Sequence, residues 1–174
     1  MQPLRIAVTG VPGCGKTSLC EFTKFDTTSV LDLAKRYDAI MPETINSDTV
    51  EIDVELLNKI LVDEWNNPPK EHLLVDGHLS HYLPVNCVIL MRCRPDVLEN
   101  RLKLRNWTEK KISENVESEL LSSIVPELDE KMKIIEIDTT NMPINDISDK
   151  VNEWINGDKV TNMLNIDWIA ELHS

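Results

Sequence analysis

The sequence has few cysteines and no pair of them in a C-x-x-C arrangement. Its four cysteines stand at positions 14, 20, 87 and 93 of a chain of 174 residues. Disulfide scaffolds and structural zinc sites need an even set of closely spaced cysteines, so this pattern excludes both classes. We interpret the four side chains as reduced thiols in a cytosolic protein.

Long apolar runs are also missing. No run approaches the ~20 residues that a membrane-spanning helix requires, and no apolar secretory segment precedes the first predicted strand. Hydrophobic residues make up 41% of the chain and charged residues 28%, as in ordinary soluble proteins. A chain of this length buries roughly two thirds of its unfolded surface in one core. We expect a cytoplasmic protein with one domain over residues 1–174 and no membrane contact.

Basic residues are scarce and unevenly placed. The chain holds 18 Lys and Arg against 30 Asp and Glu, for a net charge of −12. Residues 91–111 carry seven basic and three acidic side chains, whereas residues 112–174 carry four and fourteen. The basic segment is expected to lie over bound phosphates. The acidic segment would repel RNA and attract a basic protein, or it is a solvated face that aids solubility.

The sequence does contain a glycine-rich phosphate-binding loop. It follows the apolar stretch 4–9, precedes a helical segment, and reads Gly10-Val11-Pro12-Gly13-Cys14-Gly15-Lys16-Thr17. Glycines let such a loop bend so that successive N–H groups point at phosphates. Lys16 adds charge near the β and γ phosphates of ATP, and the Thr17 hydroxyl faces the Mg²⁺ that arrives with the nucleotide. The predicted nucleotide-binding residues here are Gly13, Cys14, Gly15, Lys16, Thr17 and Ser18.

Strands and helices alternate along the chain. Apolar runs predict strands at 4–9, 27–30, 73–76, 87–91 and 134–137, and helical periodicity predicts helices at 31–37, 54–65, 95–105, 108–131 and in the tail from 143. Residues 38–53 are expected to be irregular. Trp154 and Trp168 are interpreted as core anchors. The fold class is α/β, a P-loop NTPase with a five-stranded parallel sheet and helices on both faces.

Two polar residues follow the third predicted strand. Asp76 ends that strand, where its carboxylate can hold a water of the Mg²⁺ shell opposite Thr17. His78 comes two residues later. A turn cap for Asp76 and a solvated loop histidine for His78 are the alternative interpretations. GTPases carry an Asn-Lys-x-Asp motif, which this sequence lacks.

Three segments resemble the atypical adenylate kinases of the isoenzyme 6 type, a family found in archaea and in eukaryotic nuclei. They are the loop at 9–18, the Asp76-x-His78 element, and residues 101–117, which are similar to the family's lid signature. Kinases of shikimate, gluconate or other small molecules share the loop and a similar helix-arginine pattern. They are the nearest alternatives.

The resemblance implies a broad-specificity nucleoside monophosphate kinase that uses ATP and Mg²⁺. Its acceptor would be chiefly AMP, bound over about 29–53 under a short lid at about 104–114, with a slower ATPase activity. It also implies a role in maturation of the small ribosomal subunit through the universal ribosomal protein eleven, with nucleic acid reached only through the pre-ribosome. An ATP-hydrolysing assembly switch with little kinase activity is the alternative.

Phosphoryl transfer requires cations that close over the phosphate. Arg101 and Arg105 are four residues apart on one predicted helix face, and Arg94 lies near the same stripe. By resemblance, Arg105 contacts ATP and Trp107 lies near the adenine. Arg92 is a further candidate for phosphate contact, and a surface salt bridge is the alternative for each arginine.

Lys35 occupies the position where the family carries an acceptor-binding arginine. Either Lys35 suffices or Arg36 takes over, because a lysine lacks the bidentate fork. The predicted catalytic residues are Lys16, Asp76, His78 and Arg105, with His78 able to orient a water for hydrolysis. Only Asn106 and Trp107 separate the two predicted lid helices, so the lid is small. A low thiol pKa at Cys14, which would make the site sensitive to oxidation, is left open.

Overall fold

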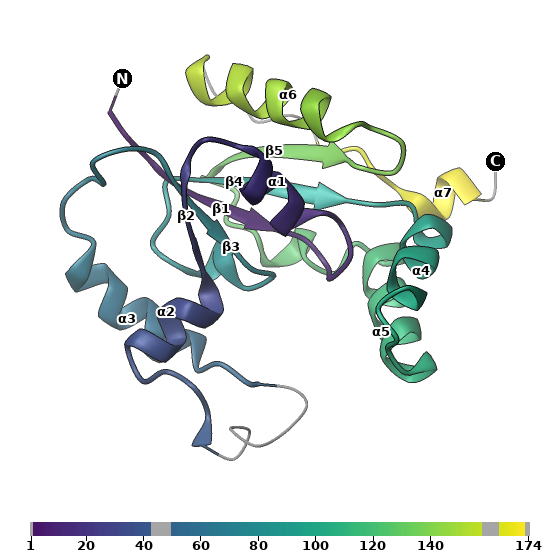
Figure 1. Cartoon of the computed structure of the whole chain (residues 1–174), viewed down its shortest axis with the longest axis horizontal. Helices are drawn as coiled ribbons and strands as arrows, with labels where there is room; N and C mark the ends of the chain where they lie inside the picture. The colour runs from purple at the N-terminus through teal and green to yellow at the C-terminus, as the bar shows by residue number, and fades with distance from the viewer. Residues whose placement is uncertain (1, 43–49, 158–163, 173–174) are drawn as a thin grey trace.

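A computed structural model of the chain describes residues 2–42, 50–157 and 164–172 (Figure 1). Its strands form one parallel sheet in the order β2-β3-β1-β4-β5. The strands are β1 (Arg5–Thr9), β2 (Asp26–Ser29), β3 (Leu73–Asp76), β4 (Cys87–Arg92) and β5 (Lys133–Asp138). The predicted fold class is confirmed, and every strand lies within one residue of its predicted bounds.

The helices cover both faces of this sheet. They are α1 (Lys16–Phe22), α2 (Val30–Arg36), α3 (Val54–Glu64), α4 (Pro95–Lys103), α5 (Glu109–Leu120), α6 (Ile144–Asn156) and α7 (Trp168–Leu172), with short 3₁₀ turns η2 (Ser80–Tyr82) and η3 (Val125–Glu127). Local chemistry explains several ends. The Asp53 side chain accepts from the Leu56 N–H at the start of α3, and the Thr108 side chain caps α5. Pro95 begins α4, where its missing N–H costs nothing.

The helix predicted over 108–131 is wrong in its second half. α5 ends at Leu120, and Ser122 takes a left-handed φ of 52°. The Ser122 hydroxyl accepts a hydrogen bond of 2.7 Å from Arg92, which lies 30 residues earlier in the chain. Pro126 then sits in the 3₁₀ turn η3. A tertiary contact therefore ends the helix where sequence periodicity would continue it.

Alternating residues of the strands point to opposite faces of the sheet and pack into two separate hydrophobic cores. Ile6 and Val8 of β1 face the cluster that includes α1, α4 and α6, whereas Ala7 faces the cluster that includes α2 and α3. Figure 1 shows α1 and α6 on one side of the sheet and α2 and α3 on the other. Trp154 and Trp168 are 9% and 2% exposed, which confirms both as core residues. Within the described ranges, no helix is both apolar enough and long enough to cross a membrane.

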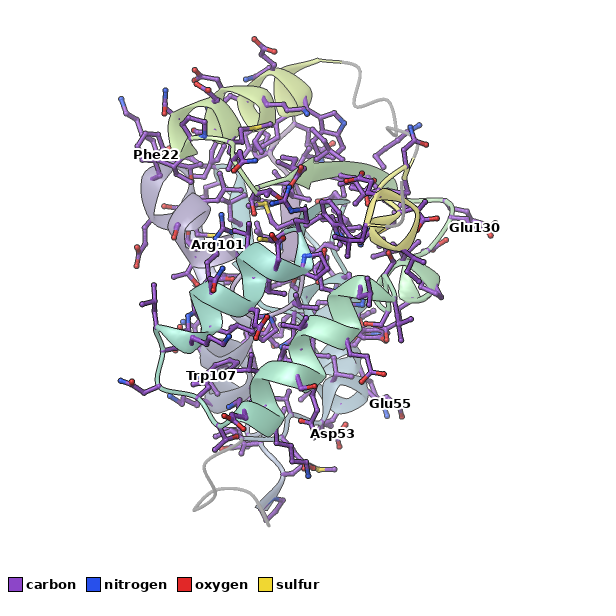
Figure 2. The ribbon with its side chains drawn as sticks, turned by 90° about the vertical axis from the view of Figure 1, so that its right-hand side faces the viewer. Phe22, Asp53, Glu55, Arg101, Trp107 and Glu130 are labelled. Carbon is purple, nitrogen blue, oxygen red and sulfur yellow. The ribbon has the colours of Figure 1, made fainter. Side chains whose placement is uncertain are left out.

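The carboxyl ends of the strands bring distant segments to one edge of the sheet. The loop after β1, the loop after β3 and the connection between α4 and α5 all meet there. Figure 2 shows α4 and α5 side by side at this edge, with Arg101 and Trp107 labelled. Gly10 opens the first loop with a φ of 143°, and a Cβ at this position would lie 2.4 Å from the Met91 carbonyl oxygen. No other residue fits there.

Candidate nucleotide site

A cavity of about 480 Å³ lies at this edge. Its walls come from five parts of the chain: the glycine-rich loop, the segment around β2 and α2, the stretch before α3, the β3–β4 loop, and the connection that leads into α5. The lining residues include Pro12, Gly13, Gly15, Lys16, Thr17, Ser18, Ser29, Leu31, Ile52, Asp76, His78, Arg105, Trp107 and Lys111. Most of the residues predicted from the loop and from the Asp76-x-His78 element therefore lie on one cavity.

Lys16 is held by its own loop. Its Nζ donates to the carbonyl oxygens of Gly10 and Val11 at 2.7 and 3.0 Å. Burial lowers the pKa of Lys16 from its ordinary value, and the charge of Arg105 acts in the same direction. The charge of Asp76 opposes this shift, and a bound phosphate would add further negative charge beside the ammonium group.

Thr17 and Asp76 meet across the cavity floor. The Thr17 hydroxyl donates to Asp76 Oδ2 at 2.7 Å, although the two residues are 59 positions apart. Strand register produces this contact, because Asp76 pairs with Val8 at the end of β1. A hydroxyl and a carboxylate are hard oxygen donors, and Mg²⁺ usually adds waters and substrate phosphates to so few protein ligands. The pair fits a magnesium ion that arrives with a nucleotide.

His78 lies on the cavity wall with its side chain partly in solvent. The protein around its ring lowers the pKa of His78, and the nearby Lys16 charge adds to this effect. The imidazole is therefore neutral at physiological pH. Its own carbonyl oxygen accepts a hydrogen bond of 3.0 Å from the Thr9 hydroxyl.

Arg105 borders two cavities. It lines the large one and a second cavity of about 320 Å³, and Gly13, Gly15 and Ser18 line both as well. Because α4 ends at Lys103, Arg105 lies beyond the helix on which the sequence had placed it. The second cavity is completed by Arg101, Leu104, Thr139, Met142, Ile144 and Ile147.

Trp107 lies on the large cavity and is not among the residues that line the second one. Lys111 Nζ lies 4.2 Å from the centroid of its ring, and the Arg105 guanidinium carbon 5.9 Å from it. Sequence reasoning did not select Lys111 as a site residue. Its position inside the predicted lid segment, at about 104–114, was the signal that could have identified it as a site residue. The connection between α4 and α5 runs over 104–108, longer than the two residues predicted.

The remaining arginines do not stand free at the site. Arg101 donates to the carbonyl oxygens of Thr139 and Thr140 at 2.7 and 3.3 Å, so it braces the base of the second cavity. Arg94 is exposed and pairs with Asp96 at 2.7 Å, which is the surface salt bridge considered from the sequence.

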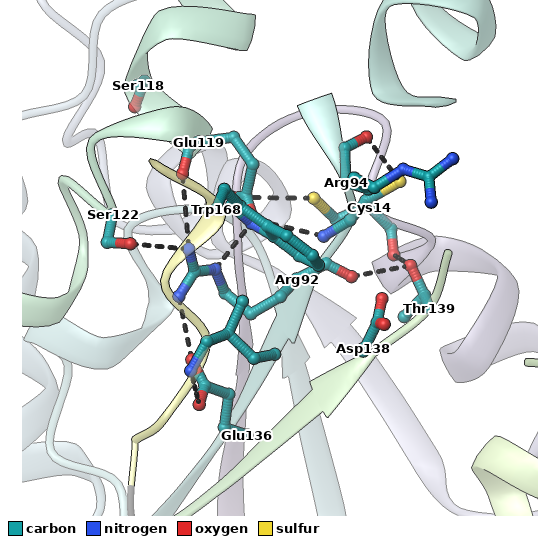
Figure 3. A network of polar contacts seen from close by, with 12 residues as sticks. Cys14, Arg92, Arg94, Ser118, Glu119, Ser122, Glu136, Asp138, Thr139 and Trp168 are labelled. Atoms are coloured by element: carbon teal, nitrogen blue, oxygen red, sulfur yellow. Dashed lines mark hydrogen bonds and ion pairs between the residues drawn. The ribbon is translucent and has the colours of Figure 1, made fainter. Parts of the chain in front are cut away.

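The prediction that Arg92 contacts phosphate is wrong. Arg92 is 2% exposed and donates to Glu119 Oε1 at 2.7 Å and to Glu136 Oε1 at 2.8 Å (Figure 3). Trp168 Nε1 donates to the same Glu119 oxygen at 2.8 Å. This buried network ties β4, α5, β5 and α7 together behind the loop.

The Cys14 side chain of the phosphate-binding loop faces the buried network around Arg92 and Glu119. It is fully buried, its thiol donates to Glu119 Oε2 at 4.0 Å, and burial raises its pKa well above the ordinary value. A reactive thiolate is therefore excluded at this position. All four cysteines are buried and none of them forms a disulfide bond, in agreement with the interpretation as reduced thiols.

Lys35 and Arg36 are exposed on α2, and neither is among the residues that line the large cavity. Leu31, one helical turn before Lys35, does line it. Because residues four apart share a helix face, Lys35 points along the cavity side of α2, and Arg36 is turned about 100° away. Of the predicted acceptor segment, residues 43–49 lie outside the described residues.

The chain matches known proteins over most of its length. Residues 6–122 match a family described as AAA domain. A protein of Archaeoglobus fulgidus named "Putative adenylate kinase" is 37% identical, with 96% of this chain and 93% of the relative aligned. A protein of the same name from Methanocaldococcus jannaschii is 33% identical, with 95% and 93% aligned.

Solved structures share the fold at low sequence identity. A shikimate kinase from Bacteroides thetaiotaomicron superposes with a TM-score of 0.54 at 15% identity, covering 88% of this chain and 99% of the other. A gluconokinase from Sinorhizobium meliloti gives a TM-score of 0.53 at 17% identity, covering 85% and 89%. These likenesses concern the fold alone. By the match over residues 6–122 and by the identity with these relatives, the chain belongs to the AAA-domain family and to the family of archaeal proteins named "Putative adenylate kinase".

Proposed function

We propose that the protein is a broad-specificity nucleoside monophosphate kinase that transfers the γ-phosphoryl group of ATP to AMP, giving two ADP. The observation that carries this proposal is the large cavity, which is lined both by the phosphate-binding loop and by residues around β2 and α2. One cavity thus has room for a donor phosphate chain and for an acceptor beside it. The relatives named adenylate kinase support the same reaction.

The two cavities suggest where each nucleotide lies. We infer that the base of ATP occupies the second cavity, because Met142, Ile144 and Ile147 offer it an apolar wall. The phosphate chain would then cross the loop at Gly13 and Gly15, which line both cavities. In this arrangement Trp107 faces the acceptor side, in contrast to the place near the adenine that the family resemblance implies.

Each site residue then has an electrostatic task. Lys16 exchanges its loop carbonyls for the β and γ phosphates, while Arg105 and Lys111 add charge over the group in transfer. Thr17, and Asp76 through a water, would hold the magnesium ion, which neutralises phosphate charge when bound. No covalent intermediate is needed, since alignment and charge neutralisation account for most of the catalysis in phosphoryl transfer.

Steady-state ADP formation tests this proposal. Purified protein with ATP and Mg²⁺ is expected to form ADP slowly, and addition of AMP is expected to raise the rate steeply. A rate that is indifferent to AMP, CMP, UMP and GMP would contradict a monophosphate kinase. Shikimate and gluconate serve as control acceptors, because the fold is shared with kinases of those compounds.

Lys35→Ala is expected to raise the KM for AMP by about tenfold or more, because a charge-assisted contact with the acceptor phosphate is lost. Arg36→Ala is the matched control and should leave this KM nearly unchanged, since Arg36 is turned away from the cavity side of α2. The KM for ATP should be unaffected in both variants. The reverse ranking of the two variants would show that Arg36 binds the acceptor.

A second candidate function is an ATP-hydrolysing assembly factor for the small ribosomal subunit. Two observations favour it: His78 on the cavity wall, and the fourteen acidic residues against four basic ones over 112–174. Its partner would be a basic protein such as the universal ribosomal protein eleven. If the ribosomal protein accelerates ATP hydrolysis and AMP does not, the result would support the function as an assembly factor.

His78→Ala is expected to lower ATP hydrolysis by about a hundredfold and transfer to AMP by much less. A neutral imidazole can orient an attacking water, whereas AMP is oriented by its own contacts with the cavity. The measurement is phosphate release without AMP beside ADP formation with AMP. Equal losses would mean that His78 shapes the site and does not act on water.

A further inference from the structure

A buried chain of hydrogen bonds lies beneath the β3–β4 loop. Thr9 Oγ1 and His81 Nδ1 are 2.9 Å apart, and His81 Nε2 and Glu127 Oε2 are 3.2 Å apart. Thr9 is 0% exposed and the His81 side chain 1%. The three residues come from the end of β1, from η2 and from η3, so the chain links three segments that are distant in sequence.

The order hydroxyl, imidazole, carboxylate is that of a hydrolase triad, but its surroundings exclude nucleophilic attack. Thr9 has no exposed surface, and it lines neither cavity of the candidate site. What Thr9 does contact is the carbonyl oxygen of His78, at 3.0 Å. This series of hydrogen bonds therefore ends on the backbone of His78, a residue that lines the large cavity.

The single proton of the Thr9 hydroxyl has two possible acceptors. Glu127 faces Nε2 of His81, so this nitrogen carries a proton. When His81 is neutral, Nδ1 is bare and competes with the His78 carbonyl for the Thr9 proton. When His81 is protonated, Nδ1 donates to Thr9, and the Thr9 proton goes to the His78 carbonyl. The hydrogen bond to His78 thus depends on the state of the His81 ring.

The neighbours of His81 set the balance between these two states. Burial lowers its pKa, and the hydrogen bond and charge of Glu127 oppose that shift. The Tyr82 ring packs against the imidazole with centroids 4.3 Å apart. Tyr82 is itself titratable, and the charge of His81 in turn helps to lower the pKa of His78. The neutral form therefore prevails near pH 7.

We propose that His81 is a positioning residue for phosphoryl transfer: together with Thr9 and Glu127 it fixes the β3–β4 loop, and with it His78 and Asp76, against the start of the phosphate-binding loop. Thr9 directly precedes Gly10, whose carbonyl oxygen holds Lys16. The same residue is thus bonded to both walls of the cavity. This inference rests on the proposed function, because it presumes that the spacing of these walls matters for transfer.

Thr9→Val tests this series of hydrogen bonds, because it removes the hydroxyl while keeping a branched side chain. The kcat for transfer is expected to fall by about tenfold to a hundredfold with the KM for ATP nearly unchanged, since misplaced catalytic groups cost rate. Thr9→Ser restores the hydroxyl and should recover most of the loss. Thr23→Val is the matched control, because it removes a hydroxyl that donates to the Cys20 carbonyl oxygen in α1 and that lines neither cavity.

A spectroscopic measurement tests the same series of hydrogen bonds without relying on activity. Long-range ¹H–¹⁵N spectra of wild-type protein should show His81 with its proton on Nε2 at neutral pH, and Thr9→Val should shift the Nδ1 resonance and the titration of this ring. A wild-type protein with His81 protonated on Nδ1 alone, or Thr9→Val with an unchanged kcat, would overturn the inference. A wild-type enzyme that phosphorylates no monophosphate would overturn the proposed function instead, and the spectra would still decide the role of His81.

Discussion

Lys16→Ala is expected to lower the kcat for ADP formation from ATP and AMP by about a thousandfold. The lysine is the one full charge that the loop itself supplies to the β and γ phosphates, and loss of a preorganised charge at developing negative charge has an effect of this size. ATP hydrolysis should fall in parallel, because both reactions use the same donor phosphates.

The control for this variant is Lys24→Ala, which removes an exposed lysine that lines neither cavity. Lys24→Ala should retain wild-type turnover. Both variants should unfold at temperatures close to the wild type, since among the described residues the Lys16 side chain donates hydrogen bonds only to carbonyl oxygens of its own loop. Wild-type turnover by Lys16→Ala would refute the assignment of the phosphate-binding loop.

Arg92→Ala is expected to lower the free energy of unfolding by about 3–5 kcal/mol. The guanidinium is buried between Glu119 and Glu136, and its removal leaves two buried carboxylates without their cation (Figure 3). It also removes the donor to the Ser122 hydroxyl, where α5 gives way to the following turn. Chemical denaturation followed by circular dichroism measures the loss.

Arg94→Ala is the matched comparison for Arg92→Ala. Arg94 belongs to the same basic segment, but its pair with Asp96 is exposed, so its replacement should hardly change the free energy of unfolding. A loss for Arg92→Ala no larger than that for Arg94→Ala would contradict the structural role given to the buried network.

Features with a local cause could be predicted from the sequence. β3 and β4 are short apolar runs that parallel sheets bury on both faces, so their bounds follow from hydrophobicity alone. Thr17 and Asp76 were expected opposite each other, because the carboxyl ends of parallel strands meet at one edge. Their hydrogen bond of 2.7 Å agrees with that expectation.

Features set by distant partners could not be predicted. The structural role of Arg92 depends on its bonds to Glu119 and Glu136, which lie 27 and 44 positions further along the chain. His81 gains its place from Thr9, 72 positions away. Cys14 stands among backbone donors that favour a thiolate, yet packing against the core raises its pKa. In each case the neighbour that decides the chemistry is close in space and far in sequence.

The most direct test of the central claim is to follow the γ-phosphoryl group itself. With ATP labelled at the γ-phosphorus, Mg²⁺ and unlabelled AMP, the account predicts that the label appears at the β-phosphorus of newly formed ADP and that each AMP consumed yields two ADP. Label found only in inorganic phosphate, with AMP unchanged, would contradict a monophosphate kinase and identify an ATPase.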